Sequence, residues 1–264
     1  MQWAALPILY DKFDVAEWSI SQQIAAQPPD IPLYLTPRDS IPLRMSFALE
    51  THQRQGPIMF DGNHIFPLMA QVSPTPELYI VIEPLDARTH LLWPELFPTI
   101  VRQPTPIPWL SGSDPIRLYL RPANTTPQHP PQHMLTTTLG DGIALLGYDV
   151  QPERLWASHI LYLQLHWLVQ KVPTGDWTVF THLLVKDSTG AKHLIAGIDS
   201  QPGGGSLLTP QWQKGWRILD EYQIKLPANL KPGEYGLEIG LYQVNGLHLP
   251  PGSAGVTLGN VKIE

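Results

Sequence analysis

The chain has 264 residues and a formal net charge of −6, and it contains no cysteine. The charge and the lack of any Lys/Arg-rich run argue against nucleic acid as a partner, because the phosphate backbone selects a basic surface. The absence of cysteine excludes disulfides and Cys-based metal sites. No apolar run reaches the roughly 18 residues of a membrane-spanning helix, so we expect no direct membrane insertion. The 29 Pro and 20 Gly favour short strands joined by turns.

Helix and strand signals alternate over residues 1–123, and this rhythm predicts a small α/β domain. Apolar residues at helical spacing predict helices over residues 11–27, 42–53 and 86–98, the last of them limited or kinked by Pro94. Short apolar runs bounded by turn residues predict strands over residues 31–37, 57–62, 77–84 and 115–123.

A proline-rich stretch containing NTTPQHPPQH makes residues 124–137 the predicted linker. The helical period then disappears, and residues 138–264 predict an antiparallel β-sandwich of immunoglobulin-like or carbohydrate-module-like shape. In PGEYGLEIGLY, apolar residues alternate with glycine and glutamate, which places Tyr235, Leu237, Ile239 and Leu241 on one face. The seven strands expected in this domain cover residues 142–150, 159–170, 177–187, 192–200, 218–226, 233–244 and 257–264.

Three consecutive glycines, Gly203, Gly204 and Gly205, lie between two predicted strands. A phosphate-binding loop would need a following lysine and a helix whose N-terminus faces the phosphate, and the sequence offers neither. The preferred interpretation is a loop that requires positive φ or close backbone approach.

Aromatic and acidic residues follow the glycines: Trp212, Trp216, Asp220 and Tyr222. Trp rings stack on sugar faces and carboxylates accept hydrogen bonds from hydroxyl groups, so these four residues are the predicted glycan contacts. The alternative is that both Trp rings cover the end of the sandwich core. Asp220 and Glu221 are poorly suited to glycoside hydrolysis, because adjacent residues of a strand point to opposite faces.

Ten histidines raise the question of a metal site. His129 and His133 are four residues apart, but the two prolines between them prevent the helix that would align them. His166 and His182 lie on predicted strands and are interpreted as cross-strand neighbours that form a hydrogen-bonded pair. A nucleophile elbow, Gly-x-Ser-x-Gly, is missing. We therefore expect no metal and no cofactor, and we assign no catalytic residue.

Several segments, in order, resemble the C-terminal extracytoplasmic region of bacterial polytopic membrane glycosyltransferases of the dolichyl-phosphate-mannose–protein mannosyltransferase type. They are FDVAEWSISQQ, IPLYLTP, PIMFDG, YIVIEPLDARTHLL, GDGIALLGYDV, VFTHLLVKDSTG, DSQPGGGSLLTPQW, ILDEYQIKLP and LKPGEYGLEIGLY. The resemblance covers most of the chain. It implies an extracytoplasmic location, periplasmic or at the cell surface, and a tether to the membrane-spanning part of a parent protein. The family's catalytic acids lie in a loop between early membrane helices, so none is carried over to this chain.

The expected function is therefore that of a non-catalytic accessory region of a membrane glycosyltransferase, which binds or presents a glycan or a polypeptide acceptor. The alternative is a structural or protein-interaction module that binds no sugar. Burial of both Trp rings, together with an exposed apolar patch elsewhere, would favour this alternative. A free-standing glycan hydrolase is a third interpretation, and it would need a pocket with two suitably spaced carboxyl groups.

Overall fold

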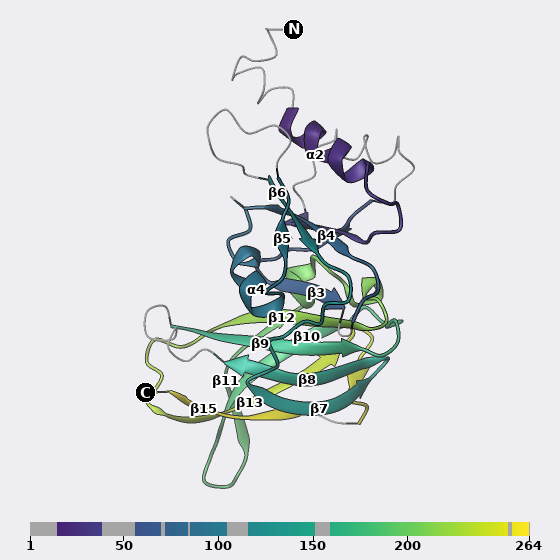
Figure 1. The fold of residues 1–264 in the computed structure, drawn as a ribbon. Helices are drawn as coiled ribbons and strands as arrows, with labels where there is room; N and C mark the ends of the chain where they lie inside the picture. Colours follow the sequence, from purple (N-terminus) through teal and green to yellow (C-terminus); the bar gives the residue numbers. More distant parts are fainter. Residues whose placement is uncertain are drawn as a thin grey trace. The chain divides into compact units, whose positions relative to one another are not determined.

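The computed structural model describes residues 15–38, 56–69, 72–83, 85–104, 116–150, 159–252 and 255–263. Within these ranges the chain is mostly β, and its strands form three five-stranded sheets (Figure 1). It divides into two compact units, Met1–Asn63 with Gln71–Gln128, and His64–Ala70 with His129–Glu264. No helix in the described ranges is both long and apolar enough to cross a membrane.

The first unit is built on a mixed sheet with the strand order β2-β1-β4-β6-β5. Strand β1 runs parallel to β2 and β4, whereas β6 is antiparallel to both β4 and β5. Among the described residues of this unit, the helices α2 and α4 accompany the sheet (Figure 1). The bounds are α2 Val15–Ala25, β1 Leu33–Thr36, β2 Ile58–Met59, β4 Glu77–Ile82, α4 Thr89–Leu96, β5 Val101–Arg102 and β6 Ile116–Arg121.

Strand β4 is buried along its whole length because both faces of this sheet are covered. On one face, Ile20 and Ile24 of α2 pack in an apolar cluster with residues of β1, β4 and β6. On the other face, Tyr79 stacks on Tyr34 at 4.7 Å and meets Trp93 of α4 edge-on at 4.9 Å. A strand covered on both sides is expected to be apolar at every position, as ELYIVI nearly is.

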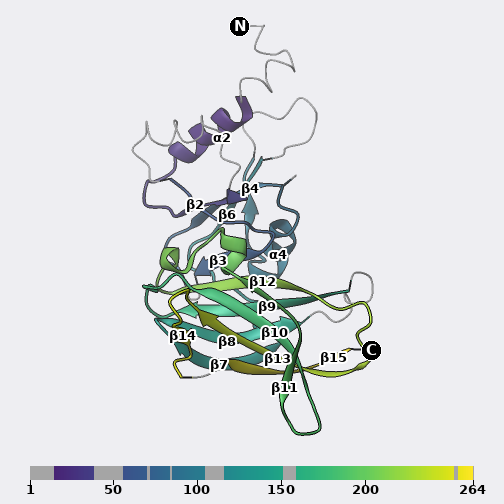
Figure 2. The same cartoon turned by 180° about the vertical axis from the view of Figure 1, so that it is seen from behind.

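The second unit contains two five-stranded antiparallel sheets. One sheet has the order β3-β12-β9-β8-β7. The other has the order β11-β10-β13-β14, and β15 also pairs with β13. The strands of this second sheet are labelled in Figure 2. The bounds are β3 Ile65–Met69, β7 His133–Gly140, β8 Ile143–Val150, β9 Ile160–Val169, β10 Thr178–Lys186, β11 Lys192–Ser200, β12 Trp216–Lys225, β13 Gly233–Tyr242, β14 His248–Leu249 and β15 Val256–Ile263.

The predicted alternation in β13 is confirmed, because Tyr235, Leu237, Ile239 and Leu241 are all buried. Strand β9 behaves in the same way, with alternate residues from Leu161 to Val169 at 1% exposure or less. Burial of these alternate residues is what a sheet with one face on a core requires. The prediction of a mostly antiparallel β region is therefore confirmed at this coarser level.

Strand β3 was not predicted, and it comes from the first half of the sequence. It pairs antiparallel with β12, so that Phe66 lies opposite Leu219 and Pro67 opposite Ile218. Proline is tolerated here because β3 is an edge strand and needs no N–H donor on its outer side. Residues 64–70 thus belong to the second unit, although the predicted boundary placed them in the first domain.

Two further predictions differ from the structure. His166 and His182 are not cross-strand neighbours, because β9 and β10 belong to different sheets; His166 lies opposite Leu219, and His182 opposite Glu238. Strand β7 begins at His133, inside the predicted linker, since the proline run ends at Pro131 and β-branched threonines follow. The helix predicted over residues 42–53 lies outside the described residues.

Candidate functional site

The glycine loop is a tight corner between β11 and β12. Gly203, Gly204 and Gly205 have φ values of 59°, 65° and 86°, a left-handed conformation that costs other residues energy. Gly203 also packs closely: a Cβ there would lie 2.4 Å from Ile65 Cγ2 on β3. The interpretation as a loop that needs positive φ or close backbone approach is therefore confirmed.

Asp220 on β12 anchors this loop from within the core. Its Oδ1 accepts a hydrogen bond from the Gly203 backbone N–H at 3.0 Å. Its Oδ2 accepts from the Tyr222 hydroxyl at 2.5 Å and from Trp167 Nε1 at 3.2 Å. Burial, followed by the Asp220 charge, raises the pKa of Tyr222 well above its ordinary value. All three donors find their acceptor on one carboxylate, which is how a buried acid is tolerated.

The predicted glycan contacts lie close together, but all four are buried. Trp212 is 1% exposed, Trp216 and Asp220 are 0%, and Tyr222 is 3%. Trp212 Nε1 donates to the Leu207 carbonyl at 3.1 Å, and its ring lies 6.5 Å from that of Trp167. No face of either Trp ring is free in this conformation for a sugar to stack on, so both rings serve the core.

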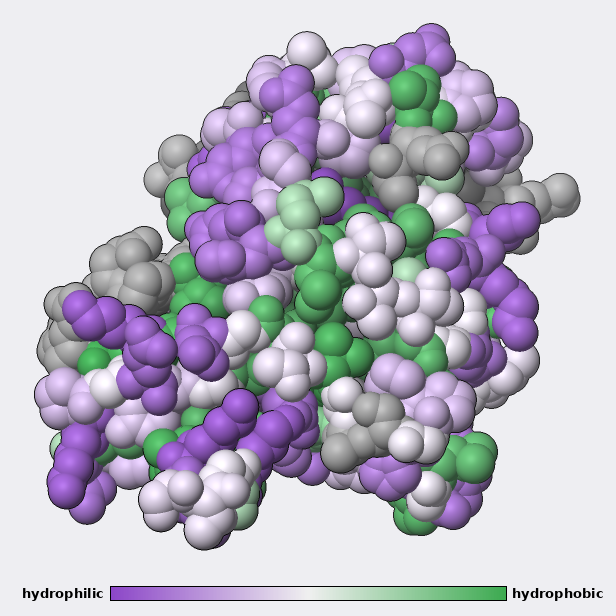
Figure 3. Space-filling view, turned by 90° about the horizontal axis from the view of Figure 1, so that it is seen from below, coloured by the Kyte–Doolittle hydropathy of each residue, from purple (hydrophilic) through white to green (hydrophobic). Residues whose placement is uncertain are grey.

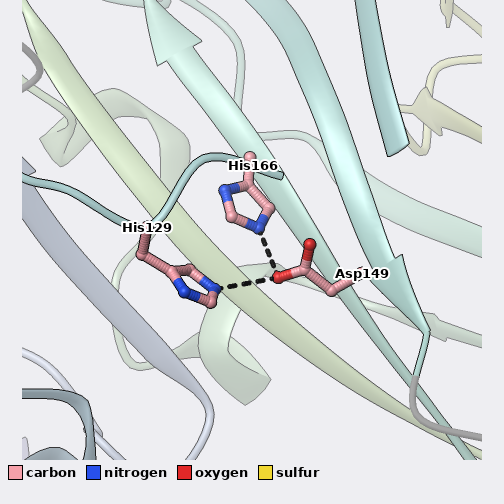
Figure 4. A group of neighbouring side chains, drawn as sticks. All are labelled: His129, Asp149 and His166. Carbon is pink, nitrogen blue, oxygen red and sulfur yellow. Dashed lines mark hydrogen bonds and ion pairs between the residues drawn. The ribbon is translucent and has the colours of Figure 1, made fainter. Parts of the chain in front are cut away.

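A second polar group lies on the other side of the same sheet and combines His129, Asp149 on β8 and His166 on β9 (Figure 4). Asp149 Oδ2 is 2.7 Å from His166 Nε2 and 3.2 Å from His129 Nε2. It also accepts from Gln164 Nε2 at 2.8 Å. Arg217 on β12 completes the group, with its Nη2 donating to His166 Nδ1 at 2.7 Å.

The contact with Arg217 decides the protonation of His166. A guanidinium only donates hydrogen bonds, so the Nδ1 that faces it must be unprotonated. The neutral ring therefore carries its proton on Nε2, from which it donates to Asp149. His166 is thus a neutral bridge between a cation and an anion, and the proton on Nε2 blocks the lone pair that a metal would need.

The same geometry bears on metal binding. His129, Asp149 and His166 bring three ligand atoms within 4.8 Å of one another, an arrangement that was not predicted from the sequence. A histidine that binds metal through one nitrogen normally donates its other N–H to an acceptor. The second nitrogen of His166 instead faces the donor Arg217. The three residues therefore fit a hydrogen-bonded network better than a metal centre.

Burial and charge act in opposite directions within this network. Burial lowers the pKa of His166 below its ordinary value, although the Asp149 carboxylate opposes the shift. Burial disfavours the charged form of Asp149 too, but hydrogen bonds from His129 and His166 outweigh it and hold the Asp149 pKa well below its usual range. Burial also lowers the pKa of Arg217 to about 10. Near neutral pH the group is Arg⁺, neutral His166 and Asp⁻.

A third polar group lies at the carboxyl ends of β1 and β4 in the first unit, where many α/β proteins bind ligands. Asp86 Oδ2 accepts from the Thr36 hydroxyl at 2.5 Å and from the Thr89 hydroxyl at 2.6 Å. Gly62 N donates to Thr36 Oγ1 at 2.7 Å, and a Cβ on Gly62 would lie 2.0 Å from Asp86 Oδ2. These side chains satisfy one another and tie three loops together.

No protein-family model matches the chain, and no curated protein matches it.

Proposed function

We propose that this chain is a non-catalytic accessory region of a bacterial membrane glycosyltransferase, positioned outside the cytoplasm, and that it acts as a structural or protein-interaction module. The observation that supports this proposal is the burial of Trp212 and Trp216, which leaves both rings to stabilise the core. Apolar surface is present elsewhere. Figure 3 shows apolar side chains gathered near the centre of one face with polar side chains around them. We propose an immunoglobulin-like or carbohydrate-module-like arrangement for the two sheets.

The hairpin of β10 and β11 is a suitable contact element for such a module. It projects beyond the other strands of its sheet (Figures 1 and 2). Leu194 on it is 59% exposed, and the first three residues of β11 are all exposed. Hydrogen bonds from Thr189 and Ala191 to Asp187 hold its turn in shape. An exposed apolar side chain on a rigid projection can anchor a protein partner.

Deletion of the coding sequence for residues 1–264 from the cells that produce this protein tests the proposal. Membranes that lack residues 1–264 should still transfer sugar from a polyprenyl-phosphate donor, with a raised KM for the acceptor and a kcat changed less than KM. A photo-crosslinker at position 194 should form an adduct with a polytopic membrane glycosyltransferase, whereas one at Val244, which is fully exposed elsewhere, should not. Unchanged kinetics would refute the accessory role, and sugar transfer by the purified chain alone would place catalysis within it.

Glycan or acceptor presentation is the second candidate function, and a different group of residues favours it. On the outer face of the β10–β13 sheet, the Tyr242 hydroxyl donates to Asp199 Oδ2 at 3.1 Å, and His182 lies 3.7 Å from Asp199 Oδ1. An aromatic ring beside a partly exposed carboxylate suits sugar hydroxyls. Saturation-transfer NMR with mannosides and mannosylated peptides tests it: Tyr242→Ala should abolish the signal and Trp212→Phe should not. Silence across the panel would leave the scaffold function alone.

A further inference from the structure

The chain returns to the second unit at the segment His129–Gln132, which follows Gln128, the last residue of the first unit. Two prolines, Pro130 and Pro131, occupy its centre, so it cannot donate backbone hydrogen bonds there. His129 has a φ of 25°, a conformation that non-glycine residues rarely adopt. A segment of this kind needs side-chain contacts to hold it in place.

The polar group around Asp149 supplies several such contacts. The Gln132 backbone N–H donates to Asp149 Oδ1 at 2.6 Å, and Gln132 Oε1 accepts from the Val150 backbone N–H at 3.3 Å. The His129 ring contacts Asp149 Oδ2 and stacks on His166 with ring centroids 5.8 Å apart. Arg217 Nη2 donates to the His129 carbonyl oxygen.

We propose that Asp149, His166 and Arg217 form an acid-sensitive latch that clasps the segment His129–Gln132 against the sheet of β8, β9 and β12. The latch closes only when His166 is neutral, because only then can the ring accept from Arg217 and donate to Asp149 at once. A proton on Nδ1 would point at the guanidinium and remove an acceptor from Arg217. The Arg217 Nη2 that loses this acceptor is the atom that also holds the His129 carbonyl.

Among the residues that the structure describes, Asp149 is the charged group that favours the protonated ring of His166. The charged and titratable groups around it are Asp149 on β8, Arg217 on β12 and His129 on the segment itself, and the two basic ones disfavour a second positive charge. Glu221 is the next acidic residue on the same face of β12, but it lies opposite Gln164 rather than His166. Its carboxylate accepts a hydrogen bond from Gln223. His166 is 0% exposed, so water does not compensate.

The direction of the pH effect follows from linkage. The pKa of His166 is lowered in the closed state relative to the ordinary value of about 6.5. The latch is therefore fully effective above about pH 6.5 and weakens as the pH falls toward and through the lower closed-state pKa. Within that window, each decrease of one pH unit raises the equilibrium constant for opening of the latch by up to about tenfold.

Amide hydrogen exchange on the full chain tests the latch. The Gln132 amide, which bonds to Asp149, should lose protection as the pH falls from 7.5 to 5.0, by up to about tenfold per pH unit below about pH 6.5, after correction for intrinsic exchange rates. The matched control is the Gly203 amide, which bonds to Asp220 in the same unit, and its protection should change little, because that carboxylate also accepts from Trp167 and Tyr222, which do not titrate in this pH range. His166→Gln, which cannot titrate, should remove most of the pH dependence at Gln132. Equal losses at both amides, or none at Gln132, would overturn the proposal.

A second measurement needs no variant. The ¹⁵N shifts of His166 at pH 7.5 should identify Nδ1 as unprotonated and Nε2 as protonated. The opposite tautomer would overturn the proposal, and so would a shift of the His166 signals on addition of stoichiometric Zn²⁺, because that result would make the group a metal site.

Discussion

The packing of the glycine loop can be measured with two adjacent substitutions, Gly203→Ala and Gly204→Ala. Both glycines have left-handed φ values, 59° and 65°, so both variants incur the cost of about 1–2 kcal/mol that this conformation imposes on alanine. Their surroundings differ. A Cβ on Gly203 would lie 2.4 Å from Ile65 Cγ2, whereas nothing lies within 4 Å of one on Gly204. Overpacking adds about 1–3 kcal/mol to the first variant only.

We therefore expect Gly204→Ala to lower the free energy of unfolding by about 1 kcal/mol and Gly203→Ala by about 3 kcal/mol. Urea unfolding followed by Trp fluorescence measures the difference, and for an m-value of about 2 kcal/mol/M the two midpoints should differ by about 1 M. Trp212 lies close to the loop and is buried, so its emission should report this transition. Equal losses in the two variants would refute the argument, because the backbone conformation alone would then account for both.

Three further predictions concern the other polar groups. Asp220→Asn should cost about 1–3 kcal/mol in urea unfolding, because an amide cannot accept from all three buried donors; a change below about 0.5 kcal/mol would contradict this. Gly62→Ala should destabilise the first unit by at least about 2 kcal/mol, seen as a lower thermal midpoint, since its Cβ would lie 2.0 Å from a carboxylate oxygen. An unchanged midpoint would contradict that close packing. Hydrogen bonds, above all from His193, lower the pKa of Asp187 to about 2, and His193→Gln should raise it in a ¹³C NMR titration. An unchanged Asp187 pKa would show that hydrogen bonds from Thr189 and from the Ala191 backbone cause the shift instead.

Much of the local structure could be predicted because it depends on patterns within short windows. The alternation in β13 predicts Tyr235 and Ile239 on the core face, and both are buried. The conformation of the three glycines was predictable for the same reason, since glycine adopts positive φ more readily than other residues. Strand β4 could be recognised from its apolar run alone.

What sequence reasoning missed depends on pairing between distant segments. Nothing within IFPLM indicates that its partner is β12, about 150 residues further along the chain. The network around Asp149 is equally nonlocal, because His129, His166 and Arg217 come from three separate segments. The Trp residues after the glycine loop illustrate a different limit. The residue types suited both an exposed sugar-binding surface and a buried end of the core. Only the burial of the two Trp rings distinguishes these interpretations.

The origin of β3 has a practical consequence for anyone who divides this protein. A fragment that starts at residue 129 or 138 lacks residues 64–70, so that β12 keeps its pairing with β9 but its other edge loses its partner from Trp216 to Asp220. An open edge of this kind invites pairing with any available strand. Two such fragments can exchange or share strands, and the product would be a dimer or an aggregate rather than a monomeric second unit. Supplying a peptide that covers residues 64–70 in trans should restore a monomer, because the peptide would occupy the open edge of β12.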